Sequence, residues 1–389
     1  MCGTFEYGLN AAAKEFDGKN KYIRITDIDD ASREFLLSDL SSPDICLDGM
    51  SKYLLSSGDI VFARTGASVG KTYIYRENDG IVYFAGFLIR AKVNQDNDAE
   101  FVFQSTLSPS YEKYIRITSQ RSGQPGVNAQ EYGEYDLFAP SKEEQQRIGH
   151  FLRGIDNLIT LHQRKYDKLQ VLKKAMLEKM FPKNGSSVPE IRFKGFTDAW
   201  EQRKLEDYLT VSAEKNTDNL YTKEDVLSVS GDFGVVNQIE FQGRSFAGAS
   251  VSNYGVVHTG DVVYTKSPLK ANPYGIIKAN KGKPGIVSVL YGVYHTRENA
   301  NADFIQMYFE QDARLNNYLR PLVNKGAKNT LLISDTDALE GEVCLAPTFD
   351  EQKAIGQFFD SLDNLITLHQ RELEKLQNIK KSMLEKMFV

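Results

Sequence analysis

Cysteine is scarce in this chain of 389 residues, and long apolar runs are absent. The three cysteines, Cys2, Cys46 and Cys344, are odd in number and far apart, which excludes a disulfide framework and a cysteine-ligated zinc site. No stretch approaches the roughly 18 to 20 apolar residues that cross a bilayer. The first residues also lack the basic start and apolar run of a signal peptide, so we expect a cytoplasmic protein without a membrane partner.

Motifs for catalysis, metals and nucleotides are missing as well. The five histidines form no H-x-H or H-E-x-x-H pattern, and no G-x-S-x-G nucleophile turn occurs. The stretch GASVGKT at residues 66–72 is one residue shorter than the phosphate-binding loop of nucleotide hydrolases. Asn272-Pro273-Tyr274 lacks the second proline of the Asn-Pro-Pro-Tyr signature of amino-methyltransferases. We therefore expect no catalytic centre and no metal or cofactor bound by this chain.

Positive charge is in slight deficit, with a net charge of −5, yet it is unevenly distributed. Residues 258–283 carry five lysines against a single acid, and residues 313–328 carry four basic residues and no acid. Nucleic-acid binding normally leaves a basic signature on the binding face rather than on the total. Segregation of this kind allows a positive face on an acidic protein.

One long segment occurs twice. Residues 144–182 and 351–389 match at 25 of 39 positions without a gap, at an offset of 207, and share the unbroken run DNLITLHQR. Each copy has the apolar period of an amphipathic helix close to a heptad seam. Ser141 and Thr348 each begin an S/T-x-x-E capping box after a proline, which predicts the helix starts. Each helix would be roughly 60 Å long at ~1.5 Å per residue, which suits a spacer.

The segments before the helices are also related. Residues 58–66 align with 260–268 at an offset of 202, and residues 135–140 align with 342–347. The chain therefore has the order globule, helix, globule, helix, with predicted boundaries at 1–140, 141–182, 183–347 and 348–389. The second globule has a lead-in segment, residues 191–202 with Trp200, which the first lacks because this alignment places Met1 opposite Arg203.

Two readings exist for His162 and His369, which occupy the same position in the two helices. In the first, each is a half-buried histidine with a hydrogen bond inside its own seam. In the second, the helices run antiparallel and the histidines meet near a pseudo-twofold axis, where polar seam residues fix register. The predicted helix-pair seam consists of Ile148, Ile155, Leu158, His162, Leu169, Ile355, Leu362, Leu365, His369 and Leu376.

The remaining chemistry lies in basic, glycine-containing loops at corresponding places in the two globules. Arginine and lysine anchor phosphates or bind guanine, whereas glutamine and asparagine pair with adenine in the major groove. Surface loops of other proteins share this composition, so the recurrence in both halves carries more weight than any single loop. The predicted DNA-contacting residues are Arg64, Thr65, Ser68, Lys71, Arg121, Gln124, Asn128, Lys266, Lys270, Asn272, Lys325, Lys328 and Asn329.

The motif GDIVFARTGASVGKT and the two helical copies of DNLITLHQR followed by MLEKMF resemble the specificity subunit of Type I restriction-modification systems. The resemblance covers nearly the whole chain. It implies an α+β fold in which two mixed α/β target recognition domains are separated by two long helices in an antiparallel coiled coil, related by a pseudo-twofold repeat.

In that family each recognition domain reads one half of a split DNA site. The resemblance implies that the helices set the gap and bind two modification subunits, which hold S-adenosylmethionine and methylate adenine, with restriction subunits as a further class of partner. Two alternatives remain at this point. One is a helical scaffold for proteins without DNA binding, and the other is a self-contained DNA methyltransferase or nuclease.

Overall fold

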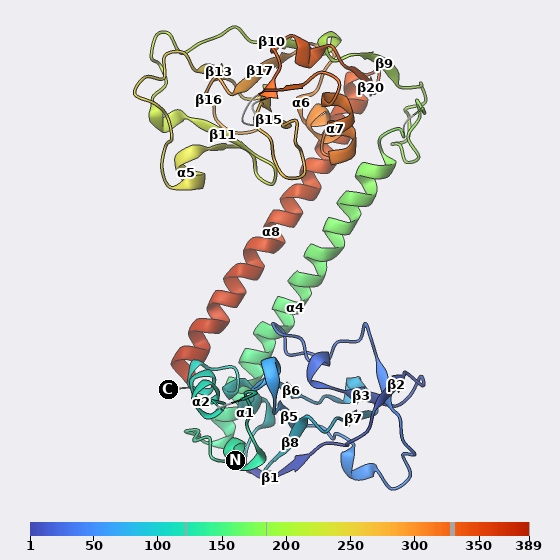
Figure 1. Ribbon diagram of the computed structural model, residues 1–389, viewed down its shortest axis with the longest axis vertical. Coiled ribbons are helices and arrows are strands. Elements are labelled where there is room, and N and C mark those ends of the chain that lie inside the picture. Colours follow the sequence, from blue (N-terminus) through green and yellow to red (C-terminus); the bar gives the residue numbers. More distant parts are fainter. Residues whose placement is uncertain (121–122, 184, 327–330, 389) are drawn as a thin grey trace. The chain divides into compact units, whose positions relative to one another are not determined.

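The computed structural model describes all residues except 121–122, 184, 327–330 and 389. The chain divides into two compact units. Unit 1 consists of Met1–Tyr166 and His369–Val389, and unit 2 of Asp167–Leu368. Each unit therefore holds one globule, the first half of the helix that follows it, and the second half of the other helix. The predicted fold class, mixed α/β domains with two long helices, is confirmed (Figure 1).

Unit 1 is built on an antiparallel sheet in the order β1-β8-β5-β6. These strands are β1 (Cys2–Tyr7), β8 (Leu88–Val93), β5 (Asp59–Ala63) and β6 (Thr72–Ile74). Two small sheets pair β2 (Ala13–Glu15) with β4 (Ser41–Pro43), and β3 (Lys21–Ile23) with β7 (Val82–Phe84) in parallel. The helices are α1 (Ala99–Ser105), α2 (Pro109–Thr118), α3 (Ala129–Gly133) and the long α4 (Lys142–Lys179).

Unit 2 repeats this sheet in the order β10-β17-β14-β15. These strands are β10 (Leu209–Val211), β17 (Tyr291–Thr296), β14 (Val262–Thr265) and β15 (Ile276–Ala279). Paired strands are β9 (Glu201–Lys204) with β20 (Glu342–Leu345), β11 (Leu227–Ser230) with β12 (Gly234–Asn237), β13 (Gly255–Val257) with β16 (Gly285–Val287), and β18 (Asn324–Lys325) with β19 (Leu331–Leu332). The helices are α5 (Gln238–Gln242), α6 (Ala302–Tyr308), α7 (Asp312–Leu319) and the long α8 (Phe349–Met387).

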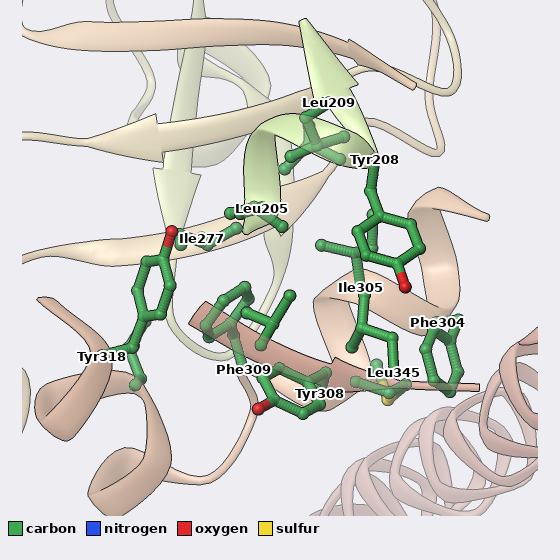
Figure 2. Close-up of a cluster of buried hydrophobic side chains, with 14 of the residues drawn as sticks. Leu205, Tyr208, Leu209, Ile277, Phe304, Ile305, Tyr308, Phe309, Tyr318 and Leu345 are labelled. Atoms are coloured by element: carbon green, nitrogen blue, oxygen red, sulfur yellow. The ribbon is translucent and has the colours of Figure 1, made fainter. Parts of the chain in front are cut away.

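Alternation of side chains along the strands gives each sheet two apolar faces. In unit 1, Ile60 and Phe62 pack with the helices, whereas Val61 and Ala63 pack with the residues of the small sheets. Successive side chains of a strand point to opposite faces, so a continuous apolar run requires a sheet covered on both sides. The same division occurs in unit 2, where the helix side holds the large aromatic cluster of Figure 2.

Strand register corrects the sequence alignment at the N-terminus. Cys2 pairs with Val93, and Leu209 pairs with Thr296, the residue equivalent to Val93 in the repeated sheet. Met1 therefore corresponds to Tyr208, not to Arg203. The constant offset of 202 misplaced it because the stretch from Cys2 to Ile60 is five residues longer than the equivalent stretch from Leu209 to Val262.

Candidate nucleic-acid interface and helix seam

The two predicted loops of the first domain lie side by side. Thr65 forms a β-bridge with Gly126, and the Gly66 N–H donates to the Pro125 carbonyl at 3.0 Å. The Val127 N–H donates in turn to the Arg64 carbonyl at 2.9 Å. Segments more than fifty residues apart in the sequence thus form one continuous surface.

Two buried tyrosines hold the first of these loops in place. The Tyr111 hydroxyl donates to the Gly70 carbonyl at 3.1 Å, and the Gly70 N–H donates to the Tyr132 hydroxyl at 3.2 Å. Burial raises the pKa of both phenols, so both hydroxyls stay protonated and able to donate. Gly70 has a φ of +84°, and a Cβ there would lie 2.6 Å from Ile115, so only glycine fits this approach to α2.

The predicted side chains of this surface differ in availability. Gln124 is exposed, and Arg64 is half-exposed with its guanidinium 5.1 Å from the Tyr7 ring centre. Lys71 forms an ion pair with Asp30, which offsets part of its positive charge. Thr65 and Ser68 are partly exposed, and Arg121 lies outside the described residues.

Asn128 has a structural task as well as an exposed position. Its side chain caps α3 by accepting the Glu131 N–H at 3.0 Å, and the Glu131 carboxylate accepts the Asn128 N–H at 2.8 Å. This is a reciprocal capping box. The amide oxygen of Asn128 is therefore already engaged in the structure.

In the second domain one predicted contact must be corrected. Asn272 is buried, and its amide donates to the Asp312 carboxylate at 2.8 Å, so it is not free to read a base edge. The sequence could not show this, because α7 brings Asp312 to it from forty residues away. Lys270 is exposed, and Lys266 pairs with Asp335 at 2.7 Å.

The second basic segment of this domain is only partly described. Lys325 belongs to β18, which pairs with β19, but its side chain is not described. Lys328 and Asn329 lie outside the described residues.

Three exposed phenylalanines of the second domain are absent from the predicted DNA-contacting residues. The Phe233 and Phe241 ring centres lie 5.3 Å apart, and the Arg244 guanidinium lies 4.5 Å from the Phe246 ring centre. All three phenylalanines are exposed. The available signal was the spacing of three phenylalanines and an arginine within fourteen residues, where surface loops are normally polar.

The helix seam has the predicted antiparallel sense within each unit. In unit 1, His162 Nδ1 lies 3.1 Å from His369 Nδ1, and Asp156 pairs with Lys380 at 2.5 Å. The sequence hypothesis that the two histidines meet is thus confirmed. In unit 2, Lys173 pairs with Asp363 at 2.7 Å. The two ion pairs are related by the repeat, because 156 and 363, like 173 and 380, differ by 207.

Two of the predicted seam residues lie off the seam. Leu158 and Leu365 are 45% and 44% exposed, whereas their neighbours Ile159 and Ile366 are more buried. A helix turns about 100° per residue, so a one-residue error moves a side chain to the flank of the helix. The other predicted seam positions are buried or partly buried: Ile148, Ile155, His162, Leu169, Ile355, Leu362, His369 and Leu376.

A buried glutamine joins the start of each long helix to its own domain. The Gln352 side chain accepts the Asn301 N–H at 2.9 Å and donates to the carbonyls of Asn299 and Ala346. Gln145, its equivalent, accepts the Asp98 N–H at 3.0 Å and donates to the Pro140 carbonyl. Buried polar side chains of this kind require all their partners, so each helix leaves its domain at a fixed point.

Equivalent phenylalanines just beyond the ends of the two long helices lie in aromatic cores. In unit 2, the Phe181 ring centre lies 5.5 Å from that of Phe304, and in unit 1 the Phe388 ring centre lies 5.0 Å from that of Phe101. Phe181 lies two residues beyond α4, the helix that follows the first domain, yet it belongs to the core of the second. Each domain is therefore completed by a helix end that comes from the other half of the sequence.

Comparison with known proteins agrees with this architecture. The family model described as "Type I restriction modification DNA specificity domain" matches residues 7–171. The putative type I restriction enzyme MjaX specificity subunit of Methanocaldococcus jannaschii is 24% identical over 365 residues, covering 88% of this chain and 80% of that protein. Over most of its length this chain is therefore similar to Type I restriction enzyme specificity subunits.

Further relatives extend the match over both domains. The type I restriction enzyme MjaVIII specificity subunit of the same organism is 22% identical over 368 residues, covering 91% of this chain and 83% of that protein. The crystal structure of the Type I restriction-modification S subunit from M. genitalium has the same fold, with a TM-score of 0.63 at 12% identity. That match covers 100% of this chain and 96% of the other.

Within the described residues, no three or more histidine, cysteine, aspartate or glutamate side chains are grouped to hold a metal ion. A search of the same residues found no helix with the length and apolar character of a membrane span.

Proposed function

We propose that this chain is a specificity subunit that reads an asymmetric, bipartite DNA site, with one half-sequence for each domain. One observation carries the proposal: the two domains share a sheet order but present different loops. Arg64, Thr65 and Gln124 line the first, whereas Lys266 and Lys270 line the second. Equal scaffolds with unequal loops favour two unlike half-sites, and the separation of half-sites follows from protein geometry.

The two long helices would set the gap between the half-sites and bind two modification subunits. Each helix exposes leucines at repeat-equivalent positions, Leu158 and Leu161 on α4 and Leu365 and Leu368 on α8. Exposed apolar residues in a row on a helix are typical of a protein-binding face. Two equivalent rows favour two copies of one partner.

In this proposal the chain itself is not catalytic and holds no cofactor. S-adenosylmethionine would be bound by the modification subunits, and restriction subunits would form a further class of partner. The test is to co-express the chain with a modification subunit and to map methylated adenines across the genome. We expect a single split sequence with a constant gap. Methylated adenines in one undivided sequence would contradict the proposal.

The second candidate function is a protein scaffold without DNA binding, which the exposed leucines favour. Salt dependence separates the two, because affinity carried by phosphate contacts falls steeply with salt and an apolar helix interface does not. Incubation of the purified chain alone with DNA and either S-adenosylmethionine or magnesium would reveal an activity of its own.

A further inference from the structure

The first basic loop of the second domain begins with a lysine that is paired with an acid. Lys266 follows β14 directly, and its Nζ lies 2.7 Å from Asp335 Oδ1. The Lys266 N–H donates to the Leu290 carbonyl at 2.8 Å, which holds its backbone next to the sheet. The side chains of Lys266 and Asp335 are 16% and 35% exposed. A positive and a negative group thus lie side by side where the sequence predicts a DNA contact.

The inner oxygen of this carboxylate is enclosed by the sheet. Asp335 Oδ1 is buried, and a Cβ at Gly292 would lie 2.6 Å from it and 2.6 Å from the Tyr294 hydroxyl. Tyr294 is 2% exposed, and its hydroxyl has no hydrogen-bond partner among the described residues. Burial raises the pKa of Tyr294, and the charge of Asp335 raises it further, so the hydroxyl stays protonated. A lysine and a buried hydroxyl therefore lie beside the same oxygen.

The other oxygen of the carboxylate is available to a ligand. The ion pair uses Oδ1, and in the described part of the chain no group donates a hydrogen bond to Asp335 Oδ2. An ammonium group has three donors and a carboxylate has two acceptor oxygens, so both keep hydrogen-bonding capacity when they pair. Lys266 and Asp335 together present a donor next to an acceptor.

An acid at this position distinguishes between two kinds of DNA contact. Phosphates attract a lysine but repel a carboxylate, so a surface that contacts only the DNA backbone gains nothing from Asp335. Base edges differ, because some of them present an amino group that a carboxylate can accept from. The acid beside Lys266 therefore favours contact with a base edge.

One kind of base pair matches this donor and acceptor. In the major groove a G·C pair presents the O6 and N7 acceptors of guanine and then the N4 amino group of cytosine, with only a C–H group beyond it. In an A·T pair the N6 amino group of adenine lies between two acceptors, adenine N7 and thymine O4, and both would repel a carboxylate. A lysine on guanine and an aspartate on cytosine avoid this repulsion.

We propose that Lys266 and Asp335 read one G·C base pair in the half-site of the second domain. Lys266 donates to O6 or N7 of the guanine, and Asp335 Oδ2 accepts from the N4 amino group of the cytosine. The contact of Oδ1 with Lys266 orients the carboxylate, so that Oδ2 is the oxygen presented to the base. This inference rests on the proposed function, because it requires the second domain to contact DNA.

The test compares the natural chain with Asp335→Asn, each co-expressed with a modification subunit, by methylation mapping. We expect the natural chain to require cytosine at one position of one half-sequence. An asparagine amide pairs with N6 and N7 of adenine, so the variant should lose about tenfold or more of the preference for cytosine and accept adenine there. Titrations of the assembled complex with duplexes that differ only at this base pair measure the change in preference.

A second variant addresses the other half of the pair. Lys266→Gln removes the lysine contact with guanine, so it should relax the preference at the same base pair as Asp335→Asn. The half-sequence of the first domain should stay unchanged in both variants, which shows that each variant chain is folded and assembled.

Asp337→Asn is the matched control, since it removes the same charge two residues away at an exposed position. It should leave both half-sequences unchanged. An Asp335→Asn chain that keeps the natural preference for cytosine would overturn the inference and leave the proposed function standing. Changes at different base pairs in the Asp335 and Lys266 variants would do the same. A natural chain without a split recognition sequence would contradict the proposed function, and this inference with it.

Discussion

His162 and His369, equivalent residues of the two repeats, face each other with their Nδ1 atoms 3.1 Å apart. At this separation one of the two Nδ1 atoms carries a proton and donates it to the other, because two N–H groups would otherwise point at each other. Partial burial lowers the pKa of His369, and the charges of His162 and Lys165 lower it further. The seam of unit 1 therefore favours the neutral form of His369.

This pair should make the stability of the seam depend on pH. The folded chain binds a proton at His369 less readily than the unfolded chain, so the contribution is complete above a pH of about 6.5 and is lost as pH falls below it. We expect the melting temperature to fall more between about pH 7.5 and about pH 5.5 in the natural chain than in His369→Gln. His150→Gln, which alters an exposed histidine of α4, is the control. Equal slopes in all three proteins would refute the role of the pair.

Removal of the buried glutamine should destabilise unit 2. Gln352→Ala leaves the Asn301 N–H and the carbonyls of Asn299 and Ala346 without their partner. A buried group left unpaired costs about 1–3 kcal/mol, and of the three hydrogen bonds only that to Ala346 is fully buried, so we expect a loss of about 2–4 kcal/mol in unfolding free energy, measured by denaturant titration. Gln357→Ala, on the exposed side of the same helix, should change it by less than about 0.5 kcal/mol. Similar losses in both variants would contradict the role of Gln352 in joining the start of α8 to its domain.

Substitutions in the two loop surfaces should have different signatures on DNA binding. Gln124→Ala should relax sequence preference in one half-site only, at a cost of about 1–3 kcal/mol, because a glutamine amide reads a base edge. Lys270→Ala should weaken binding to all sequences and reduce the salt slope by about 0.9, as expected for one phosphate contact. The measurements are methylation mapping and DNA titrations at several salt concentrations. A Gln124→Ala chain with altered preference in both half-sites would be inconsistent with separate reading by the two domains.

The gap should follow helix length when both helices change together. Insertion of four residues after Leu161 and four after His369 adds about one turn, or ~6 Å, to each helix and keeps His162 opposite His369. We expect both half-sequences to persist with a gap longer by about one to two base pairs. The unmatched insertion after Leu161 alone should lower stability, because it separates His162 from its partner. New half-sequences with an unchanged gap would argue against the helices as a spacer.

Much of this architecture could be predicted from sequence because a repeat imposes strong constraints. An ungapped match over two helices predicted their equivalence, and a polar residue at the same seam position in both predicted the meeting of the histidines. The side of each helix that faces the seam was harder to predict. Because each heptad contains three apolar residues, the apolar stripe can be placed in two ways. The sequence prediction placed Leu158 in the seam, where the structure has Ile159.

Contacts between residues that are far apart in the sequence could not be predicted from it. Asn272 belongs to a basic loop by composition, but its side chain is buried and donates a hydrogen bond to Asp312 of α7. The partners of Glu351 come from residues more than 150 positions away. Local patterns report which side chains can contact DNA or a carboxylate, whereas tertiary packing decides which of them remain available.

The exchange of aromatic helix ends has a consequence for how such a chain could have arisen. Phe181, from the first half of the sequence, packs in the core of unit 2, and Phe388, from the second half, packs in the core of unit 1. In a protein of half this length, the terminal phenylalanine could be buried only in the core of a second copy of the same molecule. Duplication and fusion of its gene would then join, in one polypeptide, two domains that already completed each other's cores.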